Sequence, residues 1–185
     1  TGILKMLYAE DIMLVKGDFV FQTSYSHSAY LTAGTLEIKG DFKRLNQAAS
    51  NTTTFNPTGT NKVLLSGDVL QKVEFANPGA NYFNRFEITN TSIDGVELVT
   101  RVDVKSELFP TNSKITNGKY LSLVGNARIL SGIWKNDLGQ YVNWTLQENI
   151  DIQGNFIQTN GLLNINGFTF DVKKDVIENS DISLN

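Results

Sequence analysis

The sequence contains no cysteine and a single histidine. The absence of cysteine excludes disulfides, thiolate nucleophiles and cysteine-ligated zinc or iron–sulfur sites, and one histidine cannot supply a multi-histidine metal centre. Proline is scarce, at 3 residues, and no apolar run reaches the about 18 residues that a membrane-spanning helix requires. Walker A and dinucleotide-binding fingerprints are also missing. We therefore expect no metal, no cofactor and no membrane span.

Charge is low and nearly balanced. Charged residues make up 19% of the chain, and 16 basic against 19 acidic residues give a net charge of −3. This balance argues against nucleic-acid binding and against a polybasic membrane anchor. The 185 residues suggest one domain with a substantial core. The chain opens with TGILKMLY, without a basic leader, which indicates a piece of a longer polypeptide.

A short phrase recurs along the chain: an apolar residue, any residue, Gly, Asp or Asn, and usually another apolar residue. Its copies centre on glycines 17, 40, 67 and 154, with a weaker copy at Gly125, and the intervals between glycines include 23, 27 and 29 residues. Around these copies apolar and polar residues alternate, which places one face of a short strand in a core. Gly-Asp or Gly-Asn then supplies a turn that tolerates positive φ and caps its own backbone. Such a repeat predicts stacked coils, because no single coil buries its apolar face alone.

Three segments depart from this pattern. The polar stretch from Phe42 to Phe55 predicts a loop extruded from the coils, and Ser131 to Leu146, with its Asn-Asp-x-Gly centre, predicts a hairpin excursion. Residues 175–185 read as a polar, poorly ordered tail, which leaves 1–174 as the domain. The segment from Ile3 to Val15 fits either a helix or a strand, and its alternation favours the strand.

Residues 31–105 resemble a module of large bacterial secreted and surface proteins. The resemblance lies in the phrase from Pro57 to Asp68 (PTGTNKVLLSGD), in Gln71, Val73 and Phe75 after it, and in FNRFEITNTS followed by Gly95-Val96. It implies a parallel β-solenoid segment, often in tandem, whose partners are neighbouring modules of the same polypeptide. Phe86 stands where the module often has a smaller aliphatic residue. The module brings no catalytic residues.

Two acidic patterns are candidate sites. Glu87, Glu97 and Asp103, beside Arg85 and Arg101, could form the acid cluster of a glycan-cleaving β-helix. Because these acids alternate with bases, a solvated outer face is the favoured interpretation. Asp18, Asp41, Asp68 and Asn155 could form a calcium ladder. Turn capping explains that series better.

Histidine and aromatic residues give two further candidates. His27 lies in a serine-rich loop without a G-x-S-x-G elbow, which favours a solvated loop residue over catalysis. Trp134, Tyr141 and Trp144 could stack on sugar rings, although a core or cross-strand role is more usual for such aromatics. They are the residues we name for possible glycan binding, and we name no catalytic residue.

The sequence therefore predicts an all-β fold, a right-handed parallel β-helix or solenoid with one hairpin excursion. An antiparallel β-sandwich is the alternative, and a failure of Ile38, Leu65 and Ile88 to share one interior column would favour it. The predicted function is a non-enzymatic structural or adhesive segment of a secreted or cell-surface bacterial protein. Surface glycans or host proteins are further possible partners. The alternatives are a carbohydrate-binding module, a polysaccharide-active β-helix, or the receptor-binding part of a toxin or fibre.

Overall fold

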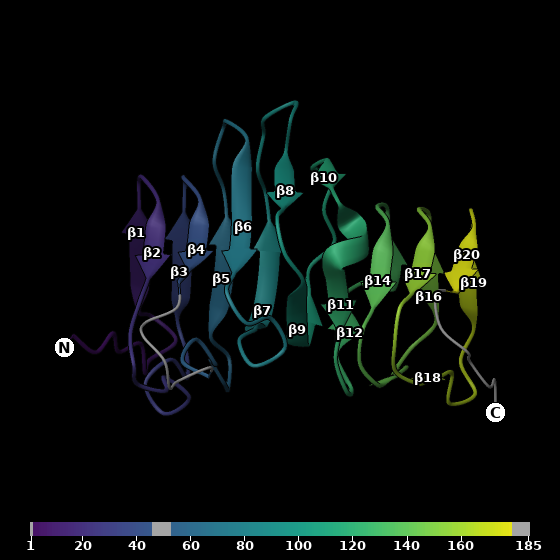
Figure 1. The fold of residues 1–185 in the computed structure, drawn as a ribbon, viewed down its shortest axis with the longest axis horizontal. Coiled ribbons are helices and arrows are strands. Elements are labelled where there is room, and N and C mark those ends of the chain that lie inside the picture. The colour runs from purple at the N-terminus through teal and green to yellow at the C-terminus, as the bar shows by residue number, and fades with distance from the viewer. Residues whose placement is uncertain (1, 46–52, 179–185) are drawn as a thin grey trace.

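The computed structural model describes residues 2–45 and 53–178, which form a right-handed parallel β-solenoid of about seven turns (Figure 1). The elements are β1 (Ile12–Val15), β2 (Phe19–Phe21), β3 (Thr35–Ile38), β4 (Phe42–Arg44), β5 (Lys62–Leu65), β6 (Gln71–Phe75), β7 (Phe83–Ile88), β8 (Val96–Leu98), β9 (Val102–Leu108), β10 (Ile115–Thr116), the 3-10 turn η1 (Gly118–Tyr120), β11 (Leu121–Leu123), β12 (Arg128–Ile129), β13 (Ile133–Trp134), β14 (Leu138–Gln140), β15 (Trp144–Thr145), β16 (Ile150–Ile152), β17 (Phe156–Gln158), β18 (Leu163–Asn164), β19 (Phe170–Val172) and β20 (Val176–Glu178). Among the described residues no helix is long and apolar enough to cross a membrane.

One long sheet runs the length of the solenoid, and the sheets opposite it change along the axis. The long sheet has the order β1-β3-β5-β7-β9-β11-β14-β17-β20, with β12 also paired to β9. In the N-terminal half it faces the sheet β10-β8-β6-β4-β2, whereas the C-terminal half adds β13-β16-β19 and β15-β18. The coils shorten accordingly: 23 residues separate the paired Lys62 and Arg85, but 18 separate Leu138 and Phe156. The cross-section thus passes from two sheets to three.

The interior is built from columns of apolar side chains at equal register. Ile38 pairs with Leu65 and Leu65 with Ile88, and all three are buried, which confirms the predicted column. A second column lies two residues earlier in each strand and contains Leu36, Val63, Phe86, Leu108 and Ile129. Both columns cross the coils at the strand spacing of about 4.8 Å. The antiparallel sandwich is excluded, because every strand pair in the described chain is parallel.

The opposite N-terminal sheet buries an aromatic cluster with one arginine inside it. Phe21 pairs with Arg44 and Arg44 with Phe75, and the arginine side chain is fully buried. Its guanidinium donates to Thr54 Oγ1 at 3.0 and 3.1 Å and to the Ala76 carbonyl at 2.8 Å. Burial lowers the pKa of Arg44 below its ordinary value. A buried cation of this kind depends on such acceptors to offset its desolvation.

Three of the five repeat glycines, Gly40, Gly67 and Gly154, serve close packing between coils rather than positive φ. Gly17, Gly40, Gly67 and Gly154 are absent from the positive-φ residues of the described chain, contrary to the predicted role, and of the five copies Gly125 alone has φ of +64°. A Cβ on Gly40 would lie 2.5 Å from the Gly17 carbonyl carbon, and one on Gly154 would lie 2.3 Å from the Asn136 carbonyl carbon. At these three positions glycine is needed because the turn lies directly against the backbone of the preceding coil, whereas a Cβ on Gly17 or Gly125 would meet nothing within 4 Å.

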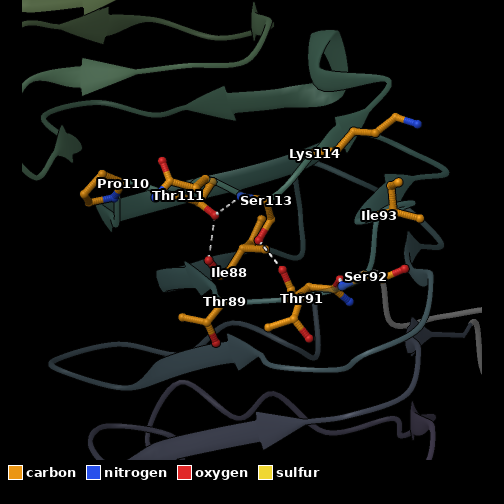
Figure 2. Close-up of a pocket in the computed structure, with 11 residues that line it drawn as sticks. Ile88, Thr89, Thr91, Ser92, Ile93, Pro110, Thr111, Ser113 and Lys114 are labelled. Atoms are coloured by element: carbon orange, nitrogen blue, oxygen red, sulfur yellow. Dashed lines mark hydrogen bonds between the residues drawn. The ribbon is translucent and has the colours of Figure 1, made fainter.

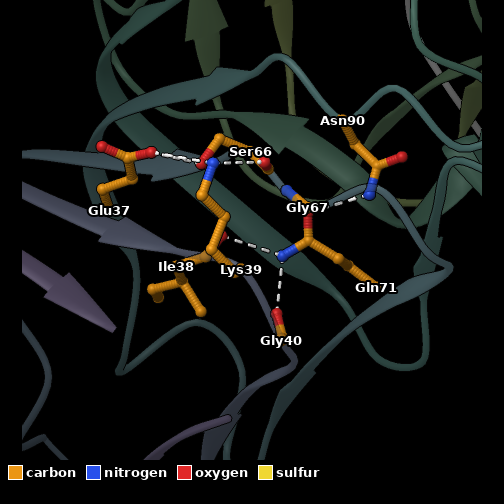
Figure 3. A network of polar contacts seen from close by, with 8 residues as sticks. All are labelled: Glu37, Ile38, Lys39, Gly40, Ser66, Gly67, Gln71 and Asn90. Carbon is orange, nitrogen blue, oxygen red and sulfur yellow. Dashed lines mark hydrogen bonds and ion pairs between the residues drawn. The ribbon is translucent and has the colours of Figure 1, made fainter. Parts of the chain in front are cut away.

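A buried glutamine joins three coils at these turns (Figure 3). Gln71 Nε2 donates to the Ile38 carbonyl at 3.0 Å and to the Gly40 carbonyl at 2.6 Å. Its Oε1 accepts from the Gly67 amide at 2.8 Å and from Asn90 Nδ2 at 2.9 Å. Both ends of the side-chain amide are satisfied, so this polar group is buried without the cost of an unmade hydrogen bond.

Three local predictions need revision. Residues 131–146 form no hairpin: β13, β14 and β15 lie within them, and each pairs in parallel with the coil that follows. The predicted tail begins with β20, which pairs with β17, and residues 179–185 lie outside the described residues. Within the predicted extruded loop, β4 belongs to the solenoid and Phe55 is buried, while residues 46–52 lie outside the described ranges. Ile12–Val15 is a strand, as favoured.

The interior column predicts that alanine substitution destabilises the protein far more at a buried leucine than at an exposed one. Leu65→Ala removes a fully buried side chain whose neighbours are held by the coils on both sides, and we expect a loss of about 2–5 kcal/mol in the free energy of unfolding. Leu70→Ala, at a turn residue that is 37% exposed, should change it by no more than about 0.5 kcal/mol. Urea denaturation followed by circular dichroism measures both. Equal losses would contradict the interior assignment.

Candidate functional site

A hollow on the surface lies where the turns between sheets stack, and we call it, together with the second cavity that adjoins it, the turn groove. A cavity of about 630 Å³ lies between residues 88–93, which follow β7, and residues 110–114, which follow β9 (Figure 2). A second cavity of about 250 Å³ shares Pro110, Thr111 and Asn112 and adds Ser131, Ile133 and Lys135. The turn groove therefore crosses three successive coils along the solenoid axis.

The floor of the turn groove is held by hydrogen bonds between coils. Thr111 Oγ1 donates to the Ile88 carbonyl at 2.7 Å, and Ser113 Oγ donates to the Asn90 carbonyl at 2.6 Å. Asn90 is in turn tied to Gln71 of the preceding coil. The backbone of the two turns is therefore fixed, while the side chains of Thr89 and Thr91 are exposed.

The two charged residues that line the turn groove are both lysines, although the exposed Asp94 follows the lining residue Ile93 in the same turn. The described lining residues of the groove include Lys114 and Lys135 and no acidic residue. Lys135 Nζ donates to Asn112 Oδ1 at 2.6 Å, whereas Lys114 Nζ makes no hydrogen bond or ion pair with any residue that the structure describes. Five lysines elsewhere on the solenoid form ion pairs with carboxylates, namely Lys39, Lys43, Lys62, Lys72 and Lys173, whereas Lys5, Lys16, Lys105, Lys119 and Lys174 make none within the described chain. The turn groove thus keeps cations that lack a carboxylate partner in the described chain.

The two tryptophans named for glycan binding lie in the core. Trp134 is fully buried and donates from Nε1 to the Asp137 carbonyl at 3.2 Å. Trp144 is 1% exposed and donates to the Ala127 carbonyl at 2.9 Å. Neither indole face is open to a sugar in this conformation, and the two take the core role that is more usual for such aromatics.

Tyr141, the third residue named for glycan binding, is half-buried and lines a separate hollow of about 560 Å³ beside Gly125 and Gly161. The Arg101 guanidinium lies 5.1 Å from its ring centroid. Burial raises the pKa of the Tyr141 phenol, which also hydrogen-bonds Thr159. Tyr141 therefore shares no described hollow with either tryptophan, and its ring contacts the Arg101 guanidinium instead.

The predicted acid cluster does not assemble. Glu97 lies on β8, in a different sheet from Glu87 on β7 and Asp103 on β9. Glu87 pairs with Lys62 at 2.6 Å and Glu97 with Lys72 at 3.1 Å, as expected of a solvated outer face. These two carboxylates form ion pairs with neighbouring lysines and do not line a common cleft.

Asp103 departs from the predicted solvated face, because it is 2% exposed. Arg101 binds its two carboxylate oxygens from Nε at 2.7 Å and Nη2 at 2.6 Å. Burial raises the pKa of Asp103 above its ordinary value of 3.8, and the hydrogen bonds and charge of Arg101 oppose that rise, with a smaller contribution from Lys105. The pair is a buried structural ion pair on the outer side of the long sheet.

Three of the four members of the predicted series, Asp18, Asp41 and Asn155, cap backbone of the next coil, whereas Asp68 makes no such bond with the described residues. Asp18 Oδ1 accepts the Asp41 amide at 2.9 Å, and Asp41 Oδ1 accepts the Lys72 amide at 2.8 Å. Asp137, Asn155 and Asp175 repeat the arrangement in the C-terminal half. The described residues contain no group of three or more potential metal ligands, so capping is the role that the geometry gives these side chains.

His27 is a core residue, contrary to the predicted solvated loop position. Its side chain is 1% exposed, its Nδ1 lies 2.9 Å from the Tyr25 carbonyl, and its ring packs edge-on against Phe21. The serine-rich neighbours of His27 in the sequence did not indicate its burial, because the residues that cover it come from other parts of the coil.

None of the candidate sites predicted from the sequence lies in the turn groove. The signal was present as a break in the repeat: the phrase that follows β7 reads Asn90-Thr91-Ser92-Ile93-Asp94-Gly95, a longer turn than the Gly-Asp corners of earlier coils.

No family model matches the chain, and no match was found among curated proteins or solved structures. The parallel solenoid implied by the resemblance of residues 31–105 is present. The bacterial surface origin that it implies stays a prediction.

The Arg101–Asp103 pair predicts a pH-dependent loss of stability. The pKa of Asp103 is higher in the folded protein than in the unfolded chain. Ionisation of Asp103 therefore lowers the free energy of unfolding above that folded pKa, and the lowering disappears as the pH falls through it. Arg101→Gln removes the cation that compensates the buried carboxylate. We expect it to lower the free energy of unfolding by about 3 kcal/mol at pH 7, and by less as the pH approaches 4.

Urea denaturation at several pH values measures this difference. Arg128→Gln is the matched control, because it removes a cation from an ion pair with Glu107 in which Arg128 is 47% exposed. We expect it to cost less than about 1 kcal/mol. A loss for Arg101→Gln that stays constant with pH would contradict the assignment.

Proposed function

We propose that this chain is a non-enzymatic structural and adhesive segment of a larger secreted or cell-surface bacterial protein, in which neighbouring modules stack on its ends. The observation that carries the proposal is the state of those ends. Among the described strands, β1 pairs with β3 alone and β2 with β4 alone, so their outer edges present unpaired backbone groups.

The N-terminal end also exposes apolar side chains on both faces of one strand. Within β1, Ile12 is 73% and Leu14 is 49% exposed on the outer face, and Met13 is 36% exposed on the face toward the core. A hollow of about 440 Å³ beside β1 and β2 is lined by Leu4, Met13, Phe19 and Phe21. Such an apolar edge strand is a template for another strand and, left bare, an aggregation site.

The C-terminal end has a similar character. Val176 and Ile177 of β20 are exposed, and β20 pairs with β17 alone in the described chain. Its three-sheet cross-section differs from the two-sheet cross-section at the other end. This difference favours distinct neighbouring modules over head-to-tail stacking of identical copies.

A spacer role follows from the long sheet between the two ends. Its ladder of parallel strands runs from β1 to β20 without a break, so bending would require distortion of many hydrogen bonds at once (Figure 1). The resemblance of residues 31–105 to a bacterial surface module supports the cellular setting. The pairing of Glu87 and Glu97 with lysines favours a non-enzymatic role over glycan cleavage.

Hydrogen exchange at β1 tests the stacking of neighbours. Backbone amides of Ile12 to Val15 are compared between this chain and the natural full-length polypeptide that carries it. We expect exchange to slow by at least about tenfold in the full-length polypeptide, because a neighbouring strand would pair the free edge.

The amides of β7, which is flanked by strands on both sides, serve as the internal control and should exchange at the same slow rate in both samples. Equal exchange at β1 in both, or a natural polypeptide that adds no residues to this chain, would rule the proposal out.

A further inference from the structure

We propose that the turn groove binds a chain of an acidic polysaccharide, which lies along the solenoid axis across three coils. The inference deepens the adhesive part of the proposed function by naming a ligand class. It rests on the shape, charge and side-chain chemistry of the groove.

The shape fits an extended ligand. The two cavities, of about 630 and 250 Å³, are joined by Pro110, Thr111 and Asn112 and extend from the end of β7 to residues 131–135 around β13. Stacked coils repeat at about 4.8 Å, so equivalent side chains recur along the groove at short, regular intervals. A linear polymer is the ligand that uses such a repeat.

The charge selects an anion. Lys114 and Lys135 lie on successive coils, and no described residue lining the turn groove is acidic, although acids outnumber bases in the chain by 19 to 16. Asn112 fixes Lys135 with a hydrogen bond of 2.6 Å, so this ammonium group is positioned before any ligand arrives. Lys114 Nζ has no hydrogen bond or ion pair with the described part of the chain.

The remaining lining residues suit a sugar. Thr89 and Thr91 expose hydroxyl groups that can both donate and accept hydrogen bonds. Ile93 is 89% exposed, the highest value among the large hydrophobic residues that the structure describes, and it lies with Lys114 at one end of the cavity (Figure 2). Ile133 and Pro110 add further apolar surface, against which the C–H face of a sugar ring can pack.

The groove is also prepared for binding. The hydrogen bonds of Thr111 to Ile88 and of Ser113 to Asn90 hold the two turns at a fixed separation. A preformed site avoids the entropic cost of ordering loops when the ligand binds. No aromatic side chain lines the turn groove in the described chain, so it lacks stacking platforms for nucleic-acid bases and for sugar rings alike, and apolar contact with a sugar falls to Ile93, Ile133 and Pro110.

Isothermal titration calorimetry with oligogalacturonate tests the proposal, with a neutral malto-oligosaccharide of equal length as the comparison. We expect the uronate to bind more tightly and its affinity to fall as salt increases. Lys114→Gln and Lys135→Gln should each weaken uronate binding about two- to fivefold. Ile93→Asp, which places a carboxylate at the rim, should weaken it at least about tenfold.

Matched controls lie elsewhere on the solenoid. Lys174→Gln removes an exposed lysine outside the turn groove, and Val99→Asp makes the same charge change at a residue that is 40% exposed. Neither should alter uronate affinity beyond experimental error. Circular dichroism confirms that all five variants keep the β-rich fold.

Several results would overturn the inference: no uronate binding at millimolar concentration, equal affinity for the neutral sugar, or groove variants with no more effect than the controls. Equally tight binding of a single-stranded DNA of the same charge would show a general polyanion surface and would also overturn it. None of these results changes hydrogen exchange at β1, so this inference and the stacking proposal fail independently.

Discussion

Each coil of this protein is stable only in register with the coils beside it, because a single coil has no second apolar layer to bury its side chains against. The pairing of Ile38 with Leu65 and of Leu65 with Ile88 meets that constraint across β3, β5 and β7 of the long sheet. Parallel pairing at fixed register places like residues above one another. A residue that suits one coil therefore has to suit the positions above and below it.

The same constraint explains the polar groups inside the solenoid. Gln71 can be buried because its amide spans three coils and finds a partner on each. Arg44 occupies an inward position between Phe21 and Phe75 because Thr54 Oγ1 and the Ala76 carbonyl accept hydrogen bonds from its guanidinium. The turn groove has the same origin, since its floor is the place where long turns of successive coils are tied together.

Alternation of apolar and polar residues, together with the recurring Gly-Asp or Gly-Asn phrase, predicted the solenoid and its interior column, because the side-chain direction along a strand alternates with the local sequence. The Gly-Asp repeat located the corners, but the predicted reason for its glycines, positive φ, holds only for Gly125; at Gly40, Gly67 and Gly154 contact with the preceding coil, which involves distant residues, requires glycine instead. The hairpin predicted at 131–146 failed for a related reason. A turn signal shows where the chain reverses and does not show whether the next strand pairs with its neighbour or with the next coil.

Burial that depends on distant residues was the other source of error. Asp103 alternates with apolar residues like a solvated acid, yet Arg101 covers it, and His27 lies in a serine-rich loop that folds into the core. The sequence around Trp134 and Trp144 does not indicate whether the two side chains are exposed or buried in the core. The turn groove is made by three turns that are more than forty residues apart from first to last, and composition within any one turn does not reveal it.

Cross-strand NMR contacts between β5 and β7 measure the stacking most directly. Parallel pairing of Leu65 with Ile88 predicts contacts between the amide proton of one strand and the α proton of the other, repeated along Lys62–Leu65. Short contacts between α protons of the two strands, which belong to antiparallel pairs, would contradict the coil arrangement and with it the ends, the groove and the interior columns.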